Sequence, residues 1–385
     1  MARKICFLIL SLFGIWKTFA PYRAYWNDMT IGGGNDFAQL YCAPHLIAGH
    51  HLYDPPAMDA EQDRIIPSVR KAGGPFWYVR LPYYAALLWP LSQLPYRVAY
   101  YCWQLIALGS IAAFIWVCSV KKLPTAILCC WFAAIPYSFV NGQDVPFLLL
   151  YLAGSTYLLR KNLPFAAGLV LSLCLAKFHL ILFLPIALLA ARRWKLFSGF
   201  VTGGLAMLIV SFAVAGWTWP VEWYRVIKTP TVNQNLDESV INLMARYCHG
   251  PLFAVAVAAL MIVLAVAVVY ASRFDYSLGM GVALLAGVVS AFHVYRYDYI
   301  LLLPLLSLAI SRACERSEQA RRSANLLAIG MVAIAGMLVG YRVFGYDVAL
   351  LFPVAALVIA RISQPRAIFG RAVSVERATP QTVQG

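Results

Sequence analysis

Long apolar runs recur along the whole chain between short polar breaks, and they constrain its fold more than any other feature. Of the 385 residues, 62% are hydrophobic, which is more apolar surface than a soluble core can bury. The pattern therefore predicts an all-α polytopic membrane protein. Twelve crossings are predicted, over residues 5–20, 98–119, 123–139, 147–160, 163–176, 178–191, 196–216, 251–271, 277–292, 299–311, 324–341 and 348–361.

Basic residues gather in the breaks on one side of these segments. With the N-terminus, these breaks hold 18 of the 31 Lys and Arg residues but only 4 of the 16 Asp and Glu residues. Cytoplasmic loops of membrane proteins are enriched in Lys and Arg, so the breaks are predicted to be cytoplasmic. The net charge of +15 then reports topology and does not indicate a nucleic-acid partner. The breaks are Lys121-Lys122, Arg160-Lys161, Arg192-Arg193 with Lys195, Arg273, 312–322 and 361–377.

Two long loops, residues 21–97 and 217–250, fall on the opposite, outer side. Both are rich in Trp and Tyr, which concentrate at membrane–water interfaces. Residues 81–95 are apolar but interrupted by prolines, and they are predicted to be interfacial because a crossing there would reverse every later basic break. Several segments are shorter than the about 20 residues of a straight spanning helix, so they must be tilted, or broken around a cavity.

The two ends of the chain need separate interpretation. Residues 5–20 resemble either a cleaved signal peptide or a retained first helix, and the absence of a small-x-small cleavage site favours the helix. Residues 364–385 carry no apolar face and are predicted to be a disordered cytoplasmic tail. The predicted organisation is one membrane domain, residues 1–363, followed by that tail.

The nine cysteines do not form a disulfide framework, because most lie in apolar runs and serve as small hydrophobic side chains. Only Cys42 and Cys248 fall in outer loops, where a bridge between them stays open. No Cys/His spacing typical of a metal site occurs. No metal site and no cofactor are predicted, and assistance by a divalent cation is left open.

Five polar clusters fall at the outer ends of the predicted helices. Ionisable groups at membrane depth are costly and usually line an interior cavity, so the clusters predict one site at the outer boundary. Burial of the Lys177 ammonium between two apolar segments requires an anionic partner. The clusters are Asn35-Asp36, the Asn-Gly-Gln-Asp of 141–144, Lys177-Phe178-His179, the Asn-Gln-Asn of 233–235 and the His-Val-Tyr-Arg-Tyr-Asp of 293–298.

Each cluster also has a purely structural interpretation, and the sequence leaves these alternatives open. They are a helix N-cap for Asp36, a turn between helices for Gln143 and Asp144, an interfacial histidine for His179, and a mutual ion pair for Arg296 and Asp298.

Several longer motifs carry a family resemblance. They are Asp-Phe-x-x-x-Tyr from Asp36, Leu-Tyr-Asp-Pro from Leu52, Trp89-Pro90-Leu91, NGQDVPFLLLYLAG, AAGLVLSLCLAKFHLILFLPIALLAARRW, VNQNL and HVYRYDYILLLPLL. Over roughly residues 30 to 310 the chain resembles glycosyltransferase family 87, which are polyprenol-phosphate-sugar-dependent enzymes that include bacterial mannosyltransferases. It departs from the family pattern at Phe178-His179, where proline commonly follows the lysine, and at Asn235, where serine is common.

The resemblance implies a GT-C-type bundle of about 12 transmembrane helices with extended outer loops, in keeping with the segment count. It also implies a hexosyltransferase, inverting at the sugar, that moves mannose or another hexose or pentose. The donor would be a polyprenyl-phosphate sugar and the acceptor a glycolipid or polysaccharide. The enzyme would lie among the lipids of the bacterial cytoplasmic membrane, with its site facing the periplasm or exterior. A transporter or flippase of lipid-linked sugars is the alternative, which the lack of repeated halves disfavours.

The resemblance also assigns roles to residues. Asp36 matches the aspartate that acts as general base on the acceptor hydroxyl. Lys177, Arg296 and His179 are assigned to the donor phosphate, whose departure needs positive charge. The glycines before Asp36 would let a bulky substrate approach the backbone. The substrate-binding candidates are Gln143, Asp144, Asn233, Gln234, His293, Asp298, Tyr53 and Asp54, and His45 and His50 are further candidates for sugar hydroxyls.

Overall fold

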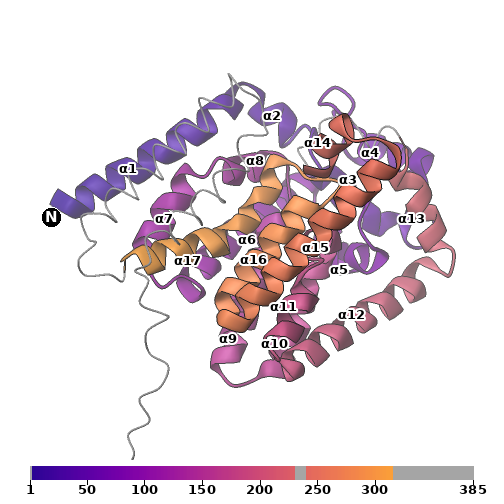
Figure 1. Cartoon of the computed structure of the whole chain (residues 1–385). Helices are drawn as coiled ribbons and strands as arrows, with labels where there is room; N and C mark the ends of the chain where they lie inside the picture. The colour runs from indigo at the N-terminus through magenta and orange to yellow at the C-terminus, as the bar shows by residue number, and fades with distance from the viewer. Residues whose placement is uncertain (1, 230–239, 315–385) are drawn as a thin grey trace, which may run out of the picture.

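The computed structural model describes residues 2–229 and 240–314, and every regular element in these ranges is a helix (Figure 1). The α-helices are α1 (Ala2–Phe19), α2 (Trp26–Met29), α3 (Phe37–Cys42), α4 (Pro55–Ile65), α5 (Pro82–Ser92), α6 (Tyr96–Val117), α7 (Lys122–Trp131), α8 (Ala134–Val140), α9 (Val145–Arg160), α10 (Pro164–Ser172), α11 (Leu184–Ala190), α12 (Trp194–Ala215), α13 (Trp219–Ile227), α14 (Val240–Tyr247), α15 (Gly250–Phe274), α16 (Tyr276–Ser290) and α17 (Leu303–Cys314). Four 3₁₀ helices join them: η1 (Ala20–Tyr25), η2 (Ala43–Leu46), η3 (Leu173–Leu180) and η4 (Arg296–Leu302).

Three of the described helices, α6, α12 and α15, are long and apolar enough to cross a membrane. Helices α7 and α8 together make a fourth candidate, bent by 60° at the break between them. A 22-residue helix extends about 33 Å, close to the about 30 Å of a bilayer core. The all-α membrane class is confirmed, whereas the described residues support three or four crossings and not the predicted twelve. The crossings predicted over 324–341 and 348–361, and the tail from 364, lie outside the described residues.

The chain between α9 and α12 folds as a broken apolar hairpin. Helix α10 runs into η3, and the backbone leaves the helical region at Lys177, with φ −123° and ψ 61°. Helix α11 leads back, because Leu196 near the start of α12 lies beside Gly168 of α10. The backbone thus breaks between the segments predicted over 163–176 and 178–191, and the break places Lys177 at the tip of the hairpin.

Helices α10 and α12 pack almost backbone to backbone. A Cβ atom at Gly168 would lie 2.1 Å from the Leu196 carbonyl oxygen, and one at Gly199 would lie 2.1 Å from the Phe165 carbonyl oxygen. Small residues that allow such close approach are the usual means of helix association in membranes, where no hydrophobic force drives it. This contact anchors the hairpin that carries Lys177.

Within the described residues, the basic breaks lie at one end of the bundle. The Arg193 guanidinium lies 5.2 Å from the ring centroid of Tyr276, which joins the break before α12 to the turn between α15 and α16. Ser119, after α6, shares a 2.7 Å hydrogen bond with Ser307 of α17. The polar clusters lie at the other end, where α2, α3, α4 and α14 gather (Figure 1). This alternation is the one that the basic residues predict.

The first long loop folds into a helical cap that shares an aromatic core with α6. Phe37 and Tyr84 of the cap and Tyr100 and Trp103 of α6 are almost fully buried in it. Helix α5 holds 11 residues with Pro90 inside and packs on α12, and it is too short to cross, as predicted for residues 81–95. Cys42 and Cys248 are both free thiols, so the bridge that the sequence left open does not form.

Two exposed positions test the membrane orientation. In a variant without native cysteines, Trp217→Cys, whose parent side chain is 84% exposed after α12, should react with an impermeant maleimide on intact cells. Lys161→Cys, in the exposed break after α9, should react only after the membrane is permeabilised. The reverse pattern would show that the basic breaks face outward.

Candidate functional site

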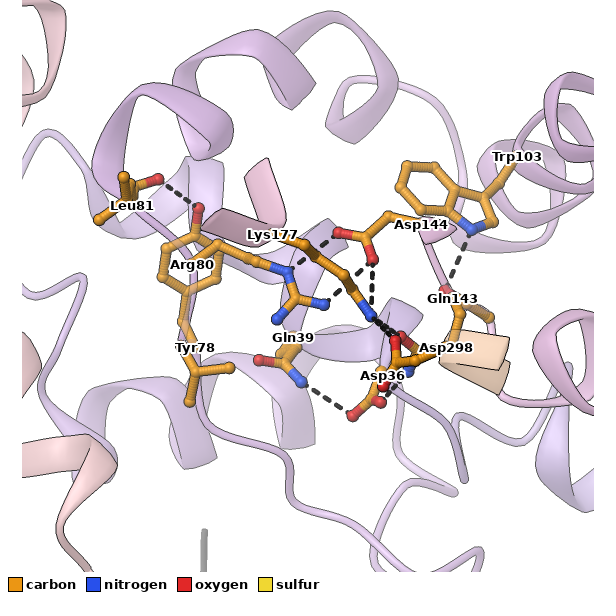
Figure 2. A network of polar contacts seen from close by, with 12 residues as sticks. Asp36, Gln39, Tyr78, Arg80, Leu81, Trp103, Gln143, Asp144, Lys177 and Asp298 are labelled. Atoms are coloured by element: carbon orange, nitrogen blue, oxygen red, sulfur yellow. Dashed lines mark hydrogen bonds and ion pairs between the residues drawn. The ribbon is translucent and has the colours of Figure 1, made fainter. Parts of the chain in front are cut away.

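Five residues predicted to belong to the site meet in one buried network (Figure 2). They come from four separate parts of the chain: the start of α3, the turn before α9, the break in η3 and the first turn of η4. The side chains of Asp144, Lys177 and Asp298 are at most 3% exposed. The five residues are Asp36, Gln143, Asp144, Lys177 and Asp298.

Lys177 is the hub of the network. Its ammonium donates to the Gln143 side-chain oxygen at 3.0 Å and to Asp298 Oδ1 at 2.9 Å, and it lies 3.4 Å from Asp144 Oδ1. The ring of Tyr297 covers it, with the centroid 4.9 Å from Nζ. The three acceptors match the three N–H donors of an ammonium group. The anionic partner that the sequence required is therefore a pair of carboxylates.

Arg80 also belongs to the site, and the sequence analysis missed it. Its Nε donates to Asp144 Oδ2 at 2.9 Å and its Nη2 to Asp144 Oδ1 at 3.0 Å, a bidentate pair. The remaining Nη1 has no acceptor within the described part of the chain. The sequence signal that could have indicated Arg80 is a lone cation within the aromatic stretch FWYVRLPYY. Such a cation needs an anionic partner when it is buried, as Lys177 does.

Asp144 is held as a carboxylate. Burial raises its pKa, but the charges of Arg80 and Lys177 and their hydrogen bonds outweigh burial and lower the pKa to about 2. Asp144 does begin α9, yet its side chain makes no capping bond. The turn between helices that was the alternative interpretation of Gln143 and Asp144 is present, and the Asp144 side chain in it also belongs to the ion network.

Asp36 differs from the other two carboxylates because no cation among the described residues contacts it. It accepts hydrogen bonds from the side-chain amides of Gln39, at 2.9 Å, and Gln143. Burial raises its pKa, and the more distant charges of Arg80 and Lys177 only partly offset that. Asp36 occupies the N-cap position of α3 but makes no capping bond, because the Asn35 side chain accepts from the Phe37 N–H instead, at 2.9 Å.

A glycine turn holds the two halves of the site together. The Asp36 N–H donates to the Asn141 carbonyl at 3.1 Å, and the Trp103 indole donates to the Gly142 carbonyl at 3.1 Å. Gly142 has φ +59°, and a Cβ atom there would lie 2.7 Å from the Phe37 Cβ. Only glycine fits this turn against the start of α3.

The other cations and histidines predicted for the site lie around the network. His179 is partly buried beside the Phe178 ring, 5.8 Å between centroids. Arg296 lies 5.6 Å from the ring of Tyr137, which stacks on Tyr297 at 5.7 Å, so two rings separate it from Lys177. His293 packs edge-on against Tyr295. Asn233 and Gln234 lie outside the described residues.

The remaining candidates of the first loop make contacts within the cap. The Tyr53 hydroxyl donates to the Arg80 carbonyl at 2.6 Å, which supports the Arg80 loop. Asp54 begins α4 and lies 3.5 Å from His51. His45 bonds Glu61 and the Ser92 carbonyl, and His50 takes a left-handed backbone with φ 58°.

The reason given for the glycines before Asp36 is wrong. A Cβ atom at Gly34 would lie 2.2 Å from the Ala72 carbonyl oxygen, and one at Gly33 would lie 2.7 Å from the Ile66 side chain, so these glycines pack closely against the protein itself.

A family model places this site among known proteins. The model of glycosyltransferase family 87 matches residues 81–295, more than half of the chain. The chain belongs to glycosyltransferase family 87. Among curated proteins and among solved structures, none matches the chain. The family 87 match includes Gln143, Asp144 and Lys177. Arg80 and Asp298 lie just outside its two ends, and Asp36 lies well before its start.

This family 87 protein is thus a membrane glycosyltransferase, and its site can be described in those terms. In the residues that the structure describes, no three His, Cys, Asp or Glu side chains are grouped so as to hold a metal ion. What the site offers is one carboxylate without a cationic partner, next to a guanidinium with a free N–H edge.

Substitution of Gly142 tests how the site is assembled. Gly142→Ala should lower the melting temperature of this glycosyltransferase by several degrees and abolish most transfer, because the methyl group collides with Phe37 and the left-handed backbone costs about 1–2 kcal/mol. Gly109→Ala, in α6 with no atom within 4 Å of the new Cβ, is the matched control and should be neutral or slightly stabilising. Equal melting curves for the two variants would contradict this role of the turn.

Proposed function

We propose that this glycosyltransferase moves a hexose or pentose, mannose being the family's example, from a polyprenyl-phosphate donor to a hydroxyl of a glycolipid or polysaccharide. The acceptor oxygen attacks the anomeric carbon while the bond from that carbon to the phosphate oxygen breaks. The proton passes to the protein and polyprenyl phosphate leaves, with inversion at the sugar. The reaction takes place at the outer face of the bacterial cytoplasmic membrane. Family membership and the opposed positions of the basic breaks and the site support this proposal.

The observation that carries the proposal is the uneven pairing of the three site carboxylates. Asp144 and Asp298 contact cations directly, and the pKa of Asp144 is accordingly low. Asp36 contacts only amides, and burial raises its pKa. A carboxylate with a higher pKa is a stronger general base. Asp36 is therefore the group of this network best suited to take the proton from the acceptor hydroxyl.

The donor phosphate is assigned to Arg80 and His179. The Arg80 guanidinium keeps its Nη1 free of protein acceptors in the described residues, and a guanidinium edge suits phosphate oxygens. Lys177 is saturated, so it reaches a phosphate only by exchanging one acceptor, and its main role is to position Gln143 and Asp298. Arg296 lies against Tyr137, on the side of the stacked Tyr137 and Tyr297 rings that is away from Lys177.

Transport of lipid-linked sugars is the competing proposal. Family membership favours transfer. Release of free polyprenyl phosphate from a panel of polyprenyl-phosphate hexoses and pentoses, which transfer produces and transport does not, separates the two.

Asp36→Asn tests the general base. The amide keeps the shape of the carboxylate but cannot accept the proton, so kcat should fall by at least about 10²-fold while donor binding persists. Asp63→Asn, which makes the same change at an exposed aspartate paired with Arg70, should transfer sugar at the wild-type rate. An N-cap role for Asp36 would make Asp36→Asn nearly silent, because Asn caps as well as Asp.

The pH profile provides an independent test. Asp36 acts as base only when ionised, and its pKa is raised above 3.8, so kcat/KM should fall on acidification along a limb that lies above the ordinary aspartate range. Asp144, with a pKa of about 2, stays ionised across that limb and does not contribute to it. Residual activity of Asp36→Asn should lack the limb. A profile that stays flat to pH 4 in the wild type would exclude Asp36 as the base.

A further inference from the structure

An apolar groove of about 530 Å³ lies beside the charged network. Helix α13 forms one wall with Trp219, Val221, Trp223 and Tyr224, and Leu81 and Phe178 form the other. Val221 and Tyr224 are about half exposed, at 54% and 50%. The volume falls within the about 300–1,000 Å³ typical of small-ligand pockets, yet the described residues that line the groove are all aliphatic or aromatic.

Two residues that line the groove are next to the site cations along the chain. Leu81 follows Arg80, and Phe178 follows Lys177, so both residues of the second wall are covalent neighbours of the site cations. In Figure 2, Leu81 lies beside Arg80 on the side away from Asp36. The Trp223 indole donates to the Val79 carbonyl at 3.0 Å and its ring lies 5.9 Å from that of Phe178, which fixes α13 over both segments.

This arrangement fits a ligand with a phosphate at one end and a single hydrocarbon chain. Burying apolar chain against Trp, Phe and Val is favourable, but a polar sugar would leave its hydroxyls without partners in such a groove. An anion at the head of the chain would meet the free edge of Arg80. Trp and Tyr along α13 are the residue types that settle at a membrane–water interface, where a lipid can enter sideways.

We infer that the groove between α13 and residues Leu81 and Phe178 binds the polyprenyl chain of the donor, with its phosphate at Arg80. The inference rests on the proposed function, because it assumes a lipid-linked phosphate donor. It assigns donor-lipid recognition to α13, in the middle of the chain. Apolar contact along the groove then adds affinity with each isoprene unit that it covers.

The test measures lipid binding directly, without transfer. Undecaprenyl phosphate and dimethylallyl phosphate, which carries a single isoprene unit, are titrated into the full-length protein in detergent and followed by native mass spectrometry. Val221→Asn should weaken undecaprenyl phosphate about tenfold and leave dimethylallyl phosphate within about twofold of the wild type. Val255→Asn is the matched control: it makes the same change at a valine 65% exposed on α15, away from the groove, and should leave both affinities unchanged.

Three outcomes would overturn the inference. Undecaprenyl phosphate could bind Val221→Asn as it binds the wild type, or Val255→Asn could weaken it equally, which would indicate non-specific partition. Dioleoyl phosphatidic acid could bind the groove as tightly as undecaprenyl phosphate, which would indicate a site for bulk lipid. Failure of the proposed function looks different: the wild type would bind undecaprenyl phosphate by chain length yet transfer no sugar from any donor of the panel.

Discussion

The arrangement of the site depends on the contacts of the buried Lys177 ammonium with its polar partners. A buried charge without partners is far more costly than the energy of one hydrogen bond, and removal of one member of a buried ion pair typically costs about 3–5 kcal/mol. The partners of Lys177 come from the turn before α9 and from η4, and a break in the apolar hairpin α10–α11 delivers the lysine to them. Satisfying one cation therefore fixes three segments that are distant in sequence, with Arg80 of the cap joined to them through Asp144.

The same constraint explains why the cap covers this end of the bundle. Asp144 is fully buried and needs more than the 3.4 Å contact with Lys177, and the bidentate Arg80 supplies it. The Tyr53 hydroxyl donates to the Arg80 carbonyl and the Trp223 indole donates to that of Val79. The segment that carries Arg80 is therefore tied to an earlier part of the first outer loop and to α13. The two segments that carry Arg80 and Lys177 thereby also supply Leu81 and Phe178 to the apolar groove.

The sequence predicted the class of fold and the convergence of the polar clusters because both follow from the cost of polar groups in a bilayer. It required an anion for Lys177 but could not choose Asp144 and Asp298, since that choice depends on how the hairpin breaks. Arg80 was missed because a cation among Trp and Tyr residues in a long loop also fits an interfacial belt. The glycines before Asp36 were misread for a related reason: their close contact is with Ala72, and sequence spacing does not reveal it. Helix length explains why fewer candidate crossings are found than were predicted. Segments such as α9 and α10 are apolar but shorter than a spanning helix.

The contacts of Gln143 explain how Asp36 can keep a raised pKa near the two cations Arg80 and Lys177. Its side-chain oxygen accepts from Lys177, so its amide nitrogen is turned toward Asp36, and neither group can be exchanged without losing a hydrogen bond. The Gln143 amide thus lies between the Lys177 ammonium and Asp36, and the ammonium contacts Asp298 and Asp144 directly. Had Lys177 reached Asp36 directly, the carboxylate would resemble Asp144, whose pKa of about 2 makes it a weak base. The Gln143 amide thus orients the Asp36 carboxylate, while burial raises the pKa of that carboxylate, as the proposed role of Asp36 as general base requires.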